Sequence, residues 1–143
     1  MCNIKNLIII GSGGVGRETA LIVQQINMLD PTWNLLGYID DNPEKWGNVV
    51  NGYAVLGGID SLLMMDSSVH VIVAIANYKV KKAIVKKLDG KFKFATIVHP
   101  KVWIHDFMKI GDGCIIYEGA ILTANISIGN HVIISPKCGV GHD

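Results

Sequence analysis

A glycine-rich loop near the start of the chain has the composition of a phosphate-binding loop. Residues 11–16 read GSGGVG, which matches G-x-G-x-x-G between an apolar run and an amphipathic segment. Glycines let the backbone approach a ligand closely, and the free amides at a helix N-terminus attract anions. The alternative is a glycine turn that only packs a helix on a strand. The candidate phosphate-binding residues are Gly11, Ser12, Gly13 and Gly14.

Polar side chains that could contact a nucleotide follow two other apolar runs. Asp40 and Asp41 come directly after residues 35–39, and Asn77 follows residues 69–76. Ligands of open α/β sheets bind at the carboxyl ends of the strands, where an acidic residue accepts hydrogen bonds from a ribose or base. Structural roles compete with this interpretation: a turn for the aspartates, Asp41 above all, and a helix cap for Asn77.

His142 and Asp143, at the end of the sequence, form the third candidate site. An imidazole titrates near neutral pH and can remove a proton from an amine or hydroxyl that attacks a thioester carbonyl. A neighbouring carboxylate could orient the ring and stabilise its charged form. Taken alone, a histidine in this place is more often inert. Of the other histidines, His99 is interpreted as a linker residue, and His105 and His131 are expected to face outward.

Strands and helices alternate over the first 97 residues. Short β-branched runs predict strands at residues 7–10, 35–39, 53–56, 69–76 and 92–98, with 53–56 at an edge. Apolar residues at helical spacing predict helices at residues 15–27 and after Asn77, the second with its lysines in solvent. The alternation predicts an α/β, Rossmann-like parallel sheet that is covered on both sides.

A six-residue period replaces the helical signal in the rest of the chain. Eight aliphatic residues recur six apart: Val98, Ile104, Ile110, Ile116, Leu122, Ile128, Ile134 and Val140. Mostly small or apolar residues stand four later: Val102, Met108, Cys114, Ala120, Ile126, Val132 and Cys138. This period fits a triangular β-helix in which each hexapeptide forms one side and its aliphatic residue points inward. Residues 98–143 make about two and a half coils, so we expect further coils or a partner chain to cover the apolar end.

Composition limits the function further. The chain has 143 residues, half of them hydrophobic, and a net charge of +1, which indicates a globular protein without a global field for nucleic acid or membranes. Seven of the thirteen basic residues fall between Lys79 and Lys93, which we interpret as a solvated helix face. Cys2, Cys114 and Cys138 lack the spacing of a zinc or redox site. We therefore expect a cytoplasmic protein with no metal, signal peptide or membrane span.

The order of these features resembles one family. GSGGVGRE, GYIDD, VIVAIANYKVKKAI, ATIVHPKVWI and a final GHD follow one another as in bacterial sugar acetyltransferases related to sialic-acid O-acetyltransferase and UDP-4-amino-sugar N-acetyltransferase. The resemblance extends over nearly the whole chain. It implies a Rossmann-like nucleotide-sugar-binding domain, residues 1–97, and the first coils of a left-handed β-helix, residues 98–143, that trimerises and holds acetyl-CoA between neighbouring coils.

The same resemblance implies an activity: acetyl-CoA-dependent transfer to an amino or hydroxyl group of a sugar, linked to UDP by preference, in surface-glycan synthesis. The attack would be direct, without a covalent enzyme intermediate. Carried over by position, His142 would be the general base, Asp143 its acidic neighbour, Gly13 and Gly14 the phosphate-side loop, Asp40 a nucleoside contact and Asn77 a contact after the third strand.

The chain departs from the relatives in three respects. Val15 stands where relatives often have histidine, and Ser135 stands where an asparagine precedes the catalytic histidine by seven residues. Relatives also continue for several more coils, so we expect little or no transferase activity from this polypeptide as given. Two other functions stay open: a nucleotide-sugar-binding module without catalysis, and a small nicotinamide oxidoreductase, against which the six-residue repeat argues.

Overall fold

A six-stranded sheet forms the first part of the structure, a computed structural model that describes residues 3–143. Its strand order is β3-β4-β2-β1-β5-β6, and every neighbouring pair is parallel except β3 with β4. The strands are β1 (Lys5–Ile10), β2 (Trp33–Ile39), β3 (Val49–Val50), β4 (Tyr53–Gly57), β5 (His70–Val73) and β6 (Lys93–Phe94). The segment predicted at an edge, residues 53–56, is therefore internal, because β3 covers its outer side.

Helices cover both faces of the sheet, as the alternation predicted. They are α1 (Gly14–Leu29), α2 (Ile59–Leu62) and α3 (Tyr78–Leu88), with a short 3-10 turn at Pro43–Lys45. Leu7 and Ile9 share a core with α1, whereas Ile8 and Ile10 pack with residues of α2 and α3. The first strand is apolar at consecutive positions because both of its faces are buried.

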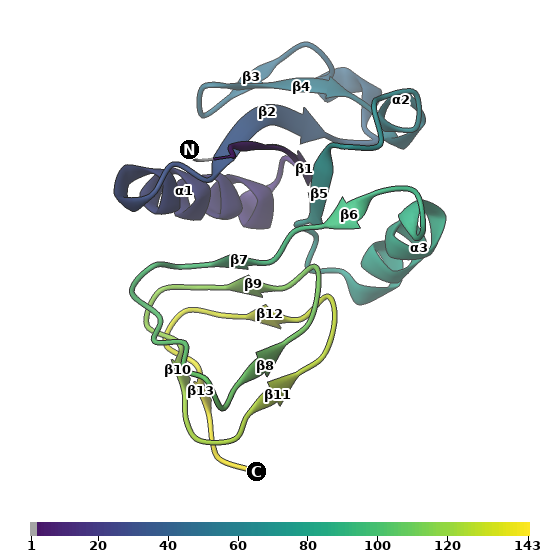
Figure 1. Cartoon of the computed structure of the whole chain (residues 1–143). Helices are drawn as coiled ribbons and strands as arrows, with labels where there is room; N and C mark the ends of the chain where they lie inside the picture. The colour runs from purple at the N-terminus through teal and green to yellow at the C-terminus, as the bar shows by residue number, and fades with distance from the viewer. Residues whose placement is uncertain (1–2) are drawn as a thin grey trace.

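Short parallel strands make up the rest of the chain. They are β7 (Ile97–Val98), β8 (Lys109–Ile110), β9 (Ile115–Ile116), β10 (Ile121–Leu122), β11 (Ser127–Ile128), β12 (Ile133–Ile134) and β13 (Gly139–Val140). They form three small sheets, β7-β9-β12, β8-β11 and β10-β13. Paired residues lie 18 apart, as in Ile97 with Ile115 and Ile115 with Ile133. Figure 1 shows the chain winding through these sheets as a three-sided coil below the six-stranded sheet.

The interior of this coil contains the residues of the six-residue period. Ile116, Leu122 and Ile134 are buried, and the smaller residues four positions later in the repeat, such as Ala120, pack with them. Ile104 is an exception, because its side chain is 44 % exposed. Residues 103–104 form no strand, so this first side of the coil is not held by a sheet.

The segment predicted as one strand, residues 92–98, is divided between the two parts of the molecule. The Ala95 amide donates to Val71 in the sheet, and the Ile97 amide donates to Cys114 in the coil. Between them, the Thr96 hydroxyl donates to the Gly111 carbonyl at 2.7 Å. The chain thus passes from one hydrogen-bonded sheet to the next within two residues.

His99 does not have the linker role expected from the sequence. Its side chain is 2 % exposed, and Nε2 lies 2.6 Å from the side-chain oxygen of Gln25 on α1. Nδ1 accepts a hydrogen bond from the Lys101 amide, so Nε2 carries the proton and donates a hydrogen bond to the Gln25 oxygen. The ring therefore fastens the start of the coil to α1.

A carboxylate holds the glycine loop against the end of β2. Asp40 Oδ2 accepts hydrogen bonds from the Ser12 amide at 3.1 Å, the Ser12 hydroxyl at 2.6 Å and Lys45 Nζ at 2.9 Å. The Asn42 amide donates to the other oxygen at 3.1 Å. Burial raises the pKa of the Asp40 carboxyl, but these hydrogen bonds outweigh burial and lower it to about 2.

The coil interior can be tested with two alanine substitutions at equivalent positions of the repeat. Ile116→Ala should lower the free energy of unfolding by about 2–5 kcal/mol, because it leaves a cavity in a packed core. Ile104→Ala should cost under about 1 kcal/mol, because its side chain already contacts solvent. Urea denaturation followed by circular dichroism measures both, and equal losses would contradict the described packing.

The Asp40 contacts predict a dependence of stability on pH. The folded pKa lies below the unfolded value, so Asp40 stabilises the fold above about pH 4 and loses this effect as pH falls through about 2. Asp40→Asn should therefore cost about 2 kcal/mol at neutral pH, and the difference should shrink in acid. Asp60→Asn is the control, since Asp60 forms only an exposed pair with Lys87. An Asp40→Asn deficit that is constant from pH 7 to pH 2 would refute this account.

Candidate functional site

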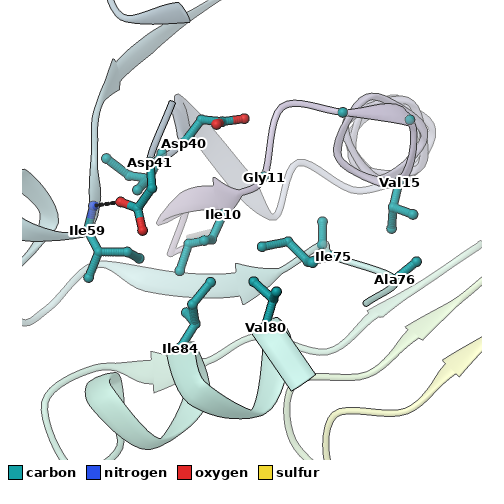
Figure 2. A pocket seen from close by; sticks show the side chains of 14 residues that line it. Ile10, Gly11, Val15, Asp40, Asp41, Ile59, Ile75, Ala76, Val80 and Ile84 are labelled. Carbon is teal, nitrogen blue, oxygen red and sulfur yellow. Dashed lines mark hydrogen bonds between the residues drawn. The ribbon is translucent and has the colours of Figure 1, made fainter. Parts of the chain in front are cut away.

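A pocket of about 400 Å³ opens at the carboxyl ends of β1, β2 and β5. The chain leaves all three strands at this edge because they run parallel, so their following loops meet there. Figure 2 shows the side chains around it. The lining residues are Ile10, Gly11, Gly13, Gly14, Val15, Ile39, Asp40, Asp41, Ile59, Ala74, Ile75, Ala76, Val80 and Ile84.

The glycine loop contributes backbone amides to this pocket that have no partner among residues 3–143. Gly13 is the N-cap of α1 and provides no side-chain cap, and the first helical hydrogen bond runs from the Arg17 amide to the Gly13 carbonyl. The amides of the first turn are therefore available to a ligand. These amides lie at the positive end of the helix dipole, which favours an anion such as a phosphate group.

The loop glycines divide into those that the fold requires and those that it does not. A Cβ on Gly16 would lie 1.8 Å from the Gly11 carbonyl oxygen, and one on Gly11 would lie 2.8 Å from that of Ala74. A Cβ on Gly13 or Gly14 would meet no atom within 4 Å. Packing of the polypeptide thus explains two of the glycines, whereas the other two leave open space beside the pocket.

The two aspartates have different surroundings. The Asp40 carboxylate is occupied by Ser12, Lys45 and Asn42. Asp41 Oδ1 accepts a hydrogen bond from the Ile59 amide at 2.8 Å at the start of α2, while Oδ2 accepts none from residues 3–143. Figure 2 shows the Asp41 carboxyl beside Ile59 and Ile10 in the pocket. Asp41 therefore has an acceptor for a ligand, although the sequence suggested it chiefly as a turn residue.

Ser12 and Asn77 do not line the pocket. The Ser12 side chain is buried against Asp40, as described above. Asn77 is the N-cap of α3, where its side-chain oxygen accepts hydrogen bonds from the Lys79 and Val80 amides. The structure thus gives both residues a role in positioning the elements around the pocket.

Apolar residues that sequence reasoning did not select form most of the pocket wall. Ile59 comes from α2, a single turn too short for a periodic signal, and Val80 and Ile84 come from α3. In Figure 2 Ile75, Val80 and Ile84 point toward Ile10 from the side opposite the aspartates. The pocket therefore combines an apolar wall with a carboxylate and free amides. The alternating pattern predicted α3 but could not show which side of it faces a ligand.

His142 and Asp143 lie at the other end of the molecule, after β13. His142 Nδ1 is 3.1 Å from Asp143 Oδ2, and the two side chains are 77 % and 71 % exposed. Figure 1 shows the C-terminal end of the coil far from the carboxyl edge of the sheet. Within one chain, the structure brings the two residues together but does not bring them to the pocket.

Residues 3–143 contain neither a candidate metal site nor a candidate membrane-spanning helix. No three histidine, cysteine, aspartate or glutamate side chains of residues 3–143 are grouped so that they could hold a metal ion. None of the helices formed by these residues has the length and apolarity needed to cross a membrane. Cys114 and Cys138 are free thiols, and Cys2 lies outside the described residues.

Solved structures of several proteins share this architecture. The acetyltransferase domain of PglB from Neisseria gonorrhoeae FA1090, in complex with acetyl coenzyme A, matches 99 % of the chain with a TM-score of 0.84 at 23 % identity. PerB from Caulobacter crescentus, in complex with CoA and GDP-perosamine, matches 100 % with a TM-score of 0.82 at 23 % identity. The chain covers 66 % of each of these structures, so it spans just under two thirds of their length. At this identity the likeness establishes the fold.

Sequence comparisons give a relative and a family. A UDP-3-O-acylglucosamine N-acyltransferase from Anaeromyxobacter dehalogenans is 33 % identical over 48 residues, which are 34 % of this chain and 14 % of that protein. The family model of the PglD N-terminal domain matches residues 6–88, which include the whole glycine loop, both aspartates and α3. Because this match extends over more than half of the chain, the protein belongs to the PglD N-terminal domain family.

Proposed function

We propose that this chain is the nucleotide-sugar-binding domain and first coils of a bacterial sugar acetyltransferase. In this proposal residues 1–97 bind the nucleotide sugar, and residues 98–143 begin a left-handed β-helix. The pocket at the carboxyl ends of β1, β2 and β5 carries the proposal, because it combines free helix-start amides, a free carboxylate oxygen and an apolar wall. Membership of the PglD N-terminal domain family supports it.

The nucleotide would bind with its phosphates at the glycine loop. The amides around Gly13 and Gly14 would donate hydrogen bonds to the phosphate oxygens, and the missing side chains would let the phosphates approach the backbone. The base would lie against the apolar wall that includes Val80 and Ile84. Asp41 Oδ2 would accept a hydrogen bond from a ring N–H or a ribose hydroxyl. A UDP-linked sugar is the preferred ligand.

The reaction would use His142 as the general base. When Nδ1–H donates a hydrogen bond to Asp143 Oδ2, Nε2 has a lone pair that can take a proton from the attacking amine or hydroxyl of the sugar. The sugar nitrogen or oxygen forms the new bond to the acetyl carbonyl carbon, the carbon–sulfur bond of acetyl-CoA breaks, and the proton passes to the coenzyme A thiolate. The acetyl group moves in one direct attack.

The distance between the pocket and His142 favours an active site shared between copies. In Figure 1 the C-terminal end of the coil lies far from the ends of β1, β2 and β5, where the pocket opens. A base from a second copy could reach a sugar that is bound in the pocket of the first. The family resemblance implies a homotrimer with acetyl-CoA between neighbouring coils, and we propose this arrangement, in which a second copy supplies the base.

Substitutions in the glycine loop test the nucleotide site. Gly13→Ala and Gly14→Ala should keep the fold, because a Cβ there meets no protein atom. They should weaken the binding of UDP-N-acetylglucosamine by about tenfold, because the new methyl group occupies the space of the phosphates. Isothermal titration calorimetry measures the affinity.

Gly16→Ala is the matched control for this experiment. It should destabilise the fold outright because its Cβ would overlap the Gly11 carbonyl. Unchanged affinity in both Gly13→Ala and Gly14→Ala would exclude phosphate binding at this loop. Binding of NADH in place of the UDP-sugar would instead indicate an oxidoreductase.

The role of His142 as general base can be tested with the protein that carries this chain. The assay measures acetyl transfer from acetyl-CoA to an amino sugar nucleotide. His142→Ala should lower kcat by about 10²- to 10⁴-fold and leave UDP-sugar binding unchanged. His105→Ala is the control, because His105 is a surface histidine elsewhere on the coil. An unchanged rate in His142→Ala would rule His142 out. Tight UDP-sugar binding without turnover of any acyl donor would indicate a binding module.

A further inference from the structure

A second cavity, of about 280 Å³, lies where α3 meets the coil. It shares no lining residue with the proposed nucleotide pocket. Two of the lining side chains are lysines, one is a histidine, one is a tyrosine, and none is a carboxylate. They are Tyr78, Lys81, Lys82, Val85 and His131.

Lys81 is unlike the other lysines of α3. Its side chain is 7 % exposed, whereas the sequence predicted that the lysines of this helix would face solvent. Its ammonium group is buried and has no hydrogen-bond partner or ion pair among residues 3–143. Burial lowers the pKa of Lys81, because water no longer solvates the charge. A buried ammonium without an acceptor destabilises a fold, which indicates that a partner for it is absent from the polypeptide itself.

His131, on the coil side of the cavity, has a second unpaired polar atom. Its ring stacks edge-on against Phe94, with the ring centres 4.6 Å apart. On the other side a Cβ at Gly113 would lie 2.2 Å from Nδ1, so only glycine leaves room for the ring. Nδ1 is buried and has no partner among the described residues. The histidine expected to face outward is thus held at the cavity by its two neighbours.

The charges around this cavity are predominantly positive. Burial and then the charge of Lys81 lower the pKa of His131, while Asp112 and Asp89 act in the opposite direction. Neither aspartate lines the cavity or forms an ion pair with Lys81 or His131 in the described chain. A cation would be repelled here, and an apolar group would leave both nitrogen atoms unsatisfied.

We propose that this cavity binds a tetrahedral oxyanion, a phosphate or sulfate group, with the Lys81 ammonium and the His131 ring as the inner donors. The ring nitrogen of His131 that faces the anion carries the proton, and the anion accepts from this nitrogen and from Lys81 Nζ. Lys82 and the Tyr78 hydroxyl contribute at the more exposed side. The cavity has room for a free phosphate ion and for the phosphoryl end of a larger metabolite.

A bound oxyanion would connect two parts of the molecule. α3 contributes Val80 and Ile84 to the nucleotide pocket and Lys81 and Val85 to this cavity. His131 comes from the turn between β11 and β12 of the coil. The anion would therefore fix α3 to the coil while the neighbouring side of the same helix lines the other pocket.

Lys81→Met tests the site, because it keeps most of the side-chain volume and removes the charge. In buffer without phosphate or sulfate, this variant should have an unchanged or higher Tm than the parent chain, since the unpaired ammonium is gone. Inorganic phosphate should raise the Tm of the parent chain relative to sodium chloride at equal ionic strength. It should raise the Tm of Lys86→Met in the same way, because Lys86 is exposed on the same helix. It should not raise the Tm of Lys81→Met.

The His131 ring provides a local measurement that separates this cavity from the glycine loop. Its Cε1–H signal, followed by NMR, should shift on phosphate addition, and Lys81→Met should weaken the affinity by about tenfold or more. Lys82→Gln should weaken it less and serves if Lys81→Met does not fold. Titration with uridine monophosphate beside inorganic phosphate distinguishes a phosphoryl metabolite from the free ion.

Two results would overturn the proposal. One is a His131 signal that neither phosphate probe nor sulfate moves at millimolar concentration. The other is a phosphate-induced rise in Tm that is the same in Lys81→Met as in Lys86→Met. Either result would mean that water alone satisfies the two nitrogen atoms.

Discussion

The contact between Gly16 and the carbonyl of Gly11 sets the position of everything at the carboxyl edge of the sheet. With no Cβ at residue 16, α1 begins directly against the end of β1. Its first amides then point over the same edge at which β2 and β5 end. Asp40 holds the loop in this place through Ser12. A larger residue at position 16 would move the helix start, and with it the anion-binding amides, away from Asp41 and the apolar wall.

The sheet and the coil are also mechanically joined, because one core belongs to both. Ala20, Ile22 and Val23 of α1 pack in the same cluster as Ile97 and Ile115 of the coil. Polar contacts reinforce this cluster, from the Tyr117 hydroxyl to Glu18 at 2.9 Å and from His99 to Gln25. The glycine loop, which would contact the phosphates of the proposed ligand, leads into α1. The same helix packs against the coil.

Much of this arrangement could be predicted from the sequence, because it follows from periodicity. The apolar runs predicted the main parallel strands, and the spacing of six predicted the interior residues of the coil, with Ile104 as the exception. The glycine loop and both aspartates line one pocket because parallel strands end together.

What the sequence could not supply depends on contacts between distant residues. Which aspartate stays free was decided by Ser12 and Lys45, and no local pattern contains that information. The burial of His99, Lys81 and His131 depends on how α1 and α3 meet the coil.

In the coil itself, residues 18 apart lie in contact. The space left by Gly113 is filled by His131, that of Gly119 by Lys137, and that of Gly111 by Gly129 and Asn130. At Gly113 and Gly119 volume is therefore shared between successive turns, so a side chain gained at either glycine requires a smaller residue one turn later, whereas at Gly111 the backbone of the next turn leaves no room. Compensating mutations in this part of the chain should appear at intervals of 18 residues, and a local reading of the sequence would miss them.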